Sequence, residues 1–191
     1  WNTFSEAYFL YEGPAVYTRT FDFNPHPEER VFLRFGAVYH DALIFLNGEF
    51  LGFHEGGDTP FNLEITNTLE KQNRIICVVN NARRPDRIPT DVTDWFNYGG
   101  IYRSVDILRV PKNFIRDYQV HLVPGSGYKK IKVIVESDGT DTEEAHIIIP
   151  ELSINAAVPL ETETQNGLQG EIHIDAQPIL WTPENPQLYK V

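Results

Sequence analysis

The feature that most constrains the fold is a series of short runs rich in β-branched and aromatic residues, each bounded by Gly, Pro, Asn or Asp. In the runs 130–136 and 171–175 polar and apolar residues alternate, so the apolar side chains fall on one face of an extended strand. No segment keeps a 3.6-residue apolar period over three turns, and only Asn67 to Gln72 fits a short helical turn. The sequence therefore predicts an all-β fold. Strands are expected over 15–23, 31–35, 43–46, 74–79, 101–108, 118–123, 130–135, 145–149 and 171–176.

The clearest local signal is the pair Asn47-Gly48, which stands between the apolar runs 43–46 and 50–51. Asn and Gly tolerate the positive φ angles that a tight hairpin turn requires. We therefore expect a β-hairpin centred on this pair.

The distribution of aromatic residues indicates two domains. Residues 1–111 hold 19 of the 24 Phe, Trp and Tyr residues, and residues 112–191 hold five. Pro111 stands at the change, and proline cannot continue a strand ladder. We predict a jelly-roll β-sandwich over 1–111 and, over the last roughly 80 residues, 112–191, an immunoglobulin-like β-sandwich.

Charge and hydropathy exclude some classes of partner. The chain has 16 Lys and Arg against 27 Asp and Glu, a net charge of −11, which disfavours nucleic acid or an anionic membrane surface as the main partner. No run approaches the roughly 18 apolar residues of a membrane span. The chain opens on Trp1 and contains no Met, so we interpret it as a piece of a longer polypeptide. Its compartment stays open between cytoplasm and periplasm.

The sequence offers few groups with catalytic or metal-binding patterns. Cys77 lies in the apolar run 75–79, which favours a buried, inert thiol over a nucleophile. The doublets Glu28-Glu29 and Glu143-Glu144 point to opposite faces of an extended chain, so neither fits a catalytic carboxyl pair. We expect no catalytic residue, no cofactor and no metal site. The histidines show no metal-ligand spacing and fit ordinary strand and loop positions; among them are His40, His54, His121 and His173.

Two loops remain as functional candidates. The stretch Arg83 to Arg87 places three positive charges in an acidic protein, which fits either a solvated loop tip or the attraction of an anionic substrate. The stretch Pro89 to Arg103 gathers aromatic residues, two acids and two adjacent glycines. Aromatic faces beside carboxylates suit sugars, because a pyranose offers an apolar C–H face and hydroxyl groups. On composition alone, a packed corner with a capping Asp fits this stretch equally well.

An ordered series of segments resembles the sugar-binding domain of glycoside hydrolase family 2, which includes β-galactosidases, β-glucuronidases and β-mannosidases. The resemblance extends to the family's immunoglobulin-like domain at the end of the chain. The segments are Trp1-Asn2 and Ser5, then 11–21, 33–38, 42–52, 54–57, 60–61, 73–79, 94–103 and 178–189.

The resemblance implies a non-catalytic role for this chain. In the family, a (β/α)₈ barrel that follows these two domains holds the catalytic glutamates, and no segment here matches the barrel's motifs. A retaining glycosidase needs two carboxyl groups about 5–5.5 Å apart. We therefore expect this chain to be the N-terminal part of a retaining β-glycosidase, inactive alone, that shapes the sugar pocket and supports the barrel. The expected partners are a β-glycoside and that barrel, and a homo-oligomeric parent also fits.

The resemblance also implies the site residues. In relatives, the aspartate of the segment that matches 94–103 contacts the sugar, so Asp94 is expected to accept hydrogen bonds from two sugar hydroxyls. Trp95, Asn97 and Tyr98 are expected to adjoin that contact. Arg103 fits an internal ion pair better than a sugar contact.

Three questions stay open at this point. The residues 94–101 resemble β-glucuronidases more closely than large β-galactosidases. The residues with which glucuronidases recognise the sugar carboxylate lie in the barrel, however, so this chain does not identify the substrate. The family usually begins with a strand before the position of Trp1, and without that strand a sheet edge would stay unpaired. A free-standing carbohydrate-binding module, or a structural or subunit-contact module, remains an alternative function.

Overall fold

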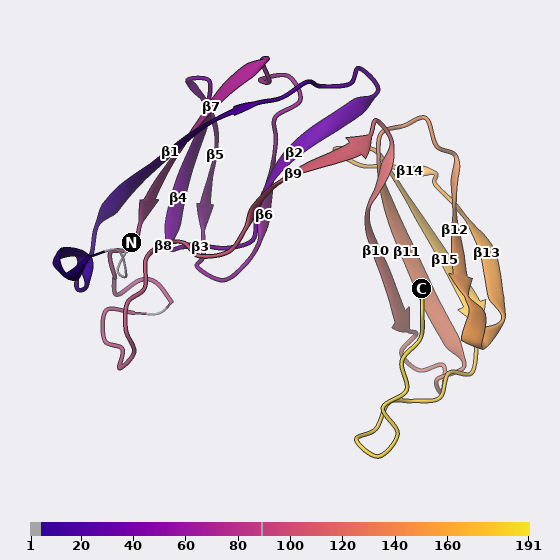
Figure 1. Ribbon diagram of the computed structural model, residues 1–191. Helices are drawn as coiled ribbons and strands as arrows, with labels where there is room; N and C mark the ends of the chain where they lie inside the picture. The colour runs from indigo at the N-terminus through magenta and orange to yellow at the C-terminus, as the bar shows by residue number, and fades with distance from the viewer. Residues whose placement is uncertain (1–4, 89) are drawn as a thin grey trace. The chain divides into compact units, whose positions relative to one another are not determined.

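β-Strands make up both halves of the computed structural model, which describes residues 5–88 and 90–191 (Figure 1). The predicted all-β fold is confirmed. The chain divides into two compact units, Trp1–Val110 and Pro111–Val191. The described residues contain no helix with the length and apolar character to cross a membrane. Trp1 and Asn2, which contribute to the family resemblance, and Pro89, which opens the candidate site stretch, lie outside the described residues.

The first unit is built from two larger sheets and one small one. The sheets have the strand orders β1-β7-β4-β5, β6-β2-β9 and β3-β8. A short 3₁₀ helix, Glu6–Tyr8, precedes them. The strands are β1 (Pro14–Asp22), β2 (Glu29–Phe35), β3 (Val38–Tyr39), β4 (Asp41–Leu46), β5 (Glu49–Glu55), β6 (Phe61–Glu64), β7 (Gln72–Asn80), β8 (Gly100–Ile101) and β9 (Val105–Pro111).

The core of the first unit lies between its two larger sheets and follows from strand alternation. Buried residues alternate with less buried ones along β2, β4 and β7, and apart from Asn73 the buried ones are apolar. Cys77 is in this core with 2% of its surface exposed, and burial raises the pKa of its thiol to about 12. The predicted burial of the Cys77 thiol is confirmed. The core residues include Val31, Leu33, Phe35, Ala42, Ile44, Leu46, Ile75, Cys77 and Val79.

The hairpin predicted at Asn47-Gly48 is confirmed. Leu46 pairs with Glu49 across a two-residue turn between β4 and β5. Both turn residues have positive φ, 51° for Asn47 and 91° for Gly48, as a tight hairpin needs. The Asn47 side chain adds three hydrogen bonds, donating to Thr68 O (2.8 Å) and Asn73 Oδ1 (3.0 Å) and accepting from Arg74 N (2.9 Å).

Two local predictions differ from the structure in their bounds. The strand expected over 101–108 is interrupted at Tyr102–Ser104, because the chain leaves β3 and joins β2 there. The Tyr102 hydroxyl donates to Gly57 O (2.7 Å), and Gly36 N donates to Ser104 O (2.9 Å), so single hydrogen bonds to distant segments replace the ladder. The helical turn expected over Asn67–Gln72 lies earlier in the chain. Thr68 N and Leu69 N both donate to Ile65 O (3.0 and 3.1 Å), which closes one turn, and Gln72 already belongs to β7.

The second unit also has two sheets around its own core. The sheets have the orders β10-β11-β15-β14 and β12-β13. The buried apolar residues of β11 (Ile131, Val133 and Val135) pack with those of the smaller sheet. The remaining bounds are β10 (Phe114–Leu122), β11 (Lys130–Asp138), β12 (Glu144–Ile149), a 3₁₀ helix (Pro150–Leu152), β13 (Ile154–Pro159), β14 (Thr162–Glu163) and β15 (Leu168–Asp175).

Replacing the Asn47 side chain tests whether this turn stabilises the first unit. Asn47→Ala removes three hydrogen bonds and puts a less tolerant residue at positive φ, so we expect a loss of about 2–4 kcal/mol in the free energy of unfolding. Urea titration followed by reaction of Cys77 with a thiol reagent reports on this unit alone, because Cys77 is the only cysteine. Asn67→Ala, at an exposed position in the neighbouring turn, is the matched control. Equal unfolding midpoints for both variants would contradict the prediction.

Candidate functional site

The segment 81–99 joins β7 to β8 without a strand or helix of its own among its described residues. Long connections of this kind inside a folded domain are commonly functional. All four residues proposed from the sequence to contact sugar lie in it: Asp94, Trp95, Asn97 and Tyr98.

This loop and the N-terminal segment around residues 9–12 together line a cavity of about 490 Å³. Asp94, Trp95 and Asn97 are part of its wall, whereas Tyr98 is not. Tyr98 instead packs edge-on against Phe96, with ring centroids 4.9 Å apart. The lining residues are Phe9, Leu10, Glu12, Arg83, Asp94, Trp95, Phe96 and Asn97.

Asp94 and Trp95, the two wall residues proposed to contact sugar most directly, face solvent. Asp94 is exposed, and 63% of Trp95 is exposed. Phe96 is partly buried and packs against Phe9, with ring centroids 4.8 Å apart. The local sequence therefore places one aromatic ring inward as an anchor and leaves the carboxylate and the indole available to a ligand.

Asn97 ties the end of the loop to its beginning. Its side-chain amide donates to the carbonyl oxygen of Asn81 at 2.9 Å. Asn81 is itself buried and bonds to the N-terminal segment, accepting from Gly13 N (2.9 Å) and donating to Tyr11 O (3.3 Å). The hydrogen bond from Asn97 thus helps to fix the shape of the loop, a role that the sequence alone did not predict.

Glu12 and Arg83 form an ion pair in the cavity wall. Nε and Nη2 of Arg83 donate to Oε1 of Glu12 at 2.8 Å and 2.5 Å. Arg83 also donates from Nη1 to the Thr93 hydroxyl at 3.5 Å, which links the two ends of the loop. The hydrogen bond from Arg83 outweighs partial burial and lowers the pKa of Glu12. Glu12 is therefore an ionised acceptor and an unsuitable proton donor near neutral pH.

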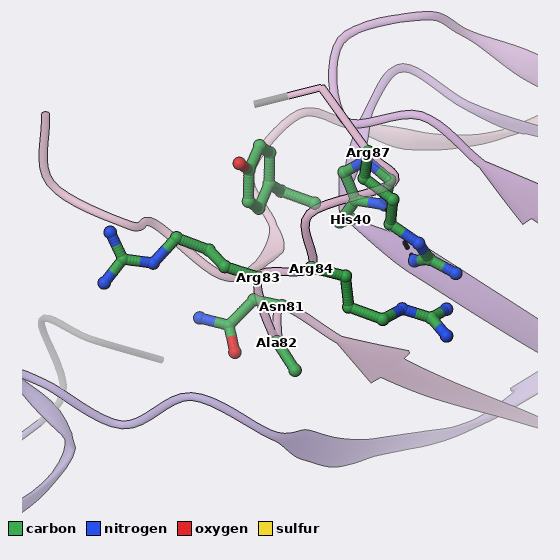
Figure 2. A pocket seen from close by; sticks show the side chains of 7 residues that line it. His40, Asn81, Ala82, Arg83, Arg84 and Arg87 are labelled. Carbon is green, nitrogen blue, oxygen red and sulfur yellow. Dashed lines mark hydrogen bonds between the residues drawn. The ribbon is translucent and has the colours of Figure 1, made fainter. Parts of the chain in front are cut away.

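Arg87 inserts into a polar cluster where β4 begins and β5 ends, and Figure 2 shows it next to His40. Its guanidinium group bonds to the Asp41 carboxylate and lies within 3.3 Å of both His40 Nδ1 and Glu55 Oε1. Only 9% of the Arg87 side chain is exposed, whereas half of the Arg84 side chain is. Figure 2 shows Arg84 and Arg87 extending to one side of the loop and Arg83 to the other.

These contacts refine the prediction for the loop Arg83 to Arg87. Its tip, 84–86, is exposed, as a solvated loop tip predicts. Arg83 and Arg87 are not free to attract an anion, because Arg83 is paired with Glu12 and Arg87 with Asp41. Sequence reasoning missed both pairs, since their partners are distant in the chain. The one available signal was a concentration of arginines in a chain of net charge −11.

The cluster also bears on metal binding. Among the described residues, His40, Asp41 and Glu55 bring possible ligand atoms within 4.8 Å of one another. The guanidinium of Arg87 contacts all three residues and provides their positive charge. This arrangement is that of a charge-compensated anchor, and a metal ion would have to displace Arg87 to bind there.

Other sequence candidates have structural contacts. Arg103 was expected in an internal ion pair, but it is exposed and its guanidinium carbon lies 5.6 Å above the ring of Tyr102. Glu29 pairs with Arg109 at 2.6 Å. Glu144, of the second doublet, lies 3.1 Å from His146 Nε2.

Comparisons with known proteins give the family context of this site. Residues 4–111 match the family described as "Glycosyl hydrolases family 2, sugar binding domain". The chain is 28% identical over 180 residues to the β-galactosidase large subunit of Leuconostoc lactis, covering 92% of this chain and 28% of that protein. It is 26% identical over 179 residues to human β-glucuronidase, covering 80% and 26%. The solved structure of a β-glucuronidase from an uncultured Clostridium species superimposes with a TM-score of 0.71 at 27% identity, covering 98% and 34%. The chain thus spans no more than about a third of these relatives.

The ion pair between Asp41 and Arg87, with side chains 13% and 9% exposed, predicts an acid-sensitive first unit. Burial disfavours the ionised form of Asp41, but hydrogen bonds from Arg87 and His40 outweigh it and lower the pKa of this carboxyl. A carboxyl whose pKa is lowered on folding stabilises the native state above its unfolded pKa near 4 and loses that contribution as pH falls through the lower folded value. We expect the unfolding midpoint of the first unit to fall below about pH 4.

Cys77 reactivity in urea, measured between pH 6 and 3 with a disulfide reagent that reacts in acid, tests this expectation. Asp41→Asn should flatten the fall below about pH 4. Glu6→Gln, at an exposed position in the N-terminal 3₁₀ helix, serves as a control that should keep the wild-type slope. An unchanged slope in Asp41→Asn would contradict the role of this ion pair.

Proposed function

The chain belongs to glycosyl hydrolase family 2, and from this premise we propose that it forms a non-catalytic wall of the sugar pocket in a larger β-glycosidase. The observation that carries the proposal is an exposed carboxylate, Asp94, next to an exposed indole, Trp95, in a cavity of about 490 Å³. The named relatives are β-galactosidases and β-glucuronidases, which supports a β-glycoside as the substrate class.

The two exposed groups suit the two kinds of surface on a sugar. A carboxylate accepts charge-assisted hydrogen bonds from neighbouring hydroxyls, and an indole face packs on the apolar C–H groups of a pyranose. In the proposed role Asp94 orients the sugar and Trp95 stacks on it. Asn97 and Tyr98 support both residues, Asn97 through its bond to Asn81 and Tyr98 through its contact with Phe96.

The charges in the cavity favour binding over proton transfer. A general acid for glycoside hydrolysis needs a raised pKa, whereas the hydrogen bond from Arg83 lowers the pKa of Glu12. In the proposal, the acid and the nucleophile come from a catalytic domain elsewhere in the longer polypeptide. The much greater length of the relatives supports this division of labour.

The same charges limit what this wall recognises. Arg83 is the one cation among the cavity's lining residues, and Glu12 already neutralises it. These residues therefore offer no unpaired positive charge to a sugar carboxylate. In the proposal, the wall contacts sugar hydroxyls and C–H faces, which galactosides and glucuronides share. In the proposal, other parts of the longer enzyme distinguish galactosides from glucuronides.

Titration with simple glycosides tests the proposal on the 191-residue chain. Methyl β-galactoside and methyl β-glucuronide are each added while the indole N–H resonance of Trp95 is followed by NMR, with its assignment taken from Trp95→Phe. We expect weak, fast-exchange shifts with a Kd in the millimolar range, because this chain supplies part of the pocket. Asp94→Ala should abolish the shifts with both sugars. Asp91→Ala, an exposed acid in the same loop outside the cavity lining, should keep them.

The other outcomes contradict the proposal in different ways. Micromolar binding would favour a free-standing carbohydrate-binding module. Turnover of an aryl β-glycoside by the purified chain would overturn the non-catalytic role. Shifts that survive Asp94→Ala would remove Asp94 as a contact.

In a longer enzyme that contains this chain, Asp94→Ala should lower kcat/KM by about 10²–10³-fold, because two charge-assisted hydrogen bonds are lost. The fold should be unchanged, since Asp94 is exposed. Assay of an aryl β-glycoside, with circular dichroism of the variant as the control for folding, measures this effect. Near-normal kcat/KM would contradict the assignment.

A further inference from the structure

Arg87 is buried although it belongs to a loop. Its side chain is 9% exposed, and the loop around it has no strand ladder to hold its backbone. Burying a guanidinium group is costly unless its charge is paired and its donors are satisfied. The positive charge of Arg87 is balanced by Asp41 of β4 and Glu55 of β5, and His40, immediately before β4, also contacts its guanidinium group.

The partners of Arg87 come from the β4–β5 hairpin. Asp41 begins β4, Glu55 ends β5, and the two residues pair in the ladder. Arg87 therefore bridges the two open ends of one hairpin. His40, immediately before β4, bonds through Nδ1 to Asp41 (2.8 Å) and through Nε2 contacts the carbonyl oxygen of Ile88 (3.3 Å). The cluster thus holds both the side chain of residue 87 and the backbone of residue 88.

The hairpin itself does not depend on Arg87. Strand β4 pairs with β7 along 41–46 and with β5 along the same residues. Its apolar face, with Ala42, Ile44 and Leu46 fully buried, packs into the core. Loss of Arg87 should leave this part of the sandwich folded and release the loop, because regions with few backbone hydrogen bonds open independently of the core.

We propose that Arg87 is a positioning residue that fixes Asp94 and Trp95 by locking their loop onto the ends of the β4–β5 hairpin. The inference rests on the proposed function in that it takes these two residues as the sugar contacts. Arg83 completes the arrangement from the other side through Glu12 and Thr93. The loop is then held at two points before the site residues begin.

The position of the loop can be measured without any sugar. The indole N–H resonance of Trp95 reports on the loop, and that of Trp181, in the second unit, is an internal reference. Hydrogen exchange of the backbone amides of 90–99, compared with those of β7, separates opening of the loop from unfolding of the sandwich.

Arg87→Ala should shift the Trp95 resonance, leave Trp181 in place and speed exchange at 90–99 by about tenfold or more while β7 stays protected. Arg87→Lys, which keeps the charge but cannot bridge two carboxylates with a planar group, should restore part of the change. Arg84→Ala is the matched control from the same loop, half exposed and 3.7 Å from Asp41, and should behave as wild type. If Arg87→Ala fails to fold, Glu55→Gln removes the more exposed partner and should give the same changes in smaller degree.

Unchanged resonance and exchange in Arg87→Ala, or in Glu55→Gln where the first variant does not fold, would overturn the inference. Equal changes in Arg84→Ala would overturn it as well. Adding methyl β-galactoside separates this result from the proposed function. If the loop is displaced in Arg87→Ala but the wild-type chain shows no shifts with the sugar, the positioning role is supported and the proposed function is contradicted. An undisplaced loop with a sugar response that needs Asp94 contradicts only the positioning role.

Discussion

The candidate site depends on side-chain bonds that replace a missing backbone ladder. The segment 81–99 leaves the sandwich after β7 and returns at β8, and between them its shape is set by side-chain contacts to the N-terminal segment, to strand β4 and within the loop. Arg83 binds Glu12, Arg87 binds Asp41, and Asn97 binds back to Asn81. Because these contacts involve charged or buried groups, each costs more to break than an exposed hydrogen bond. The sandwich provides fixed partners, and the loop presents Asp94 and Trp95 to solvent.

Charge pairing also decides between two roles that an arginine-rich loop can have in a folded protein. Its arginines can attract an anionic sugar, or they can hold the loop in place. Arg83 and Arg87 are committed to carboxylates of their own chain, and only Arg84 leaves half of its side chain exposed. The wall therefore contributes an acceptor and an aromatic face in our account, and recognition of a sugar carboxylate is left to the rest of the enzyme. This sharing fits a domain whose relatives carry the names of both β-galactosidases and β-glucuronidases.

Much of the fold could be predicted because it follows from local chemistry. Alternating apolar residues identified the strands, and Asn47-Gly48 identified its hairpin through the φ angles that only a few residues tolerate. The interruption at Tyr102–Ser104 could not be predicted in this way, because its residues suit a strand and the break arises from a change of partner sheet. The contacts of Arg87 were missed because they too depend on tertiary structure. Its partners are more than thirty residues away, and neither sequence spacing nor composition indicates which carboxylate an arginine will reach.

The site residues were named from family resemblance, and their contact with sugar stays a prediction. Asp94, Trp95 and Asn97 line one cavity, but composition alone fitted a packed corner equally well. The distinction lies in exposure, since an aspartate that caps a corner bonds to backbone, whereas Asp94 faces solvent. A crystal structure with a bound β-glycoside, of this chain or of a longer enzyme that contains it, is the most direct test of that distinction. The account predicts two sugar hydroxyls within about 2.5–2.9 Å of the Asp94 carboxylate and a sugar face against Trp95. A sugar bound elsewhere, or one whose hydroxyls make no contact with Asp94, would contradict it.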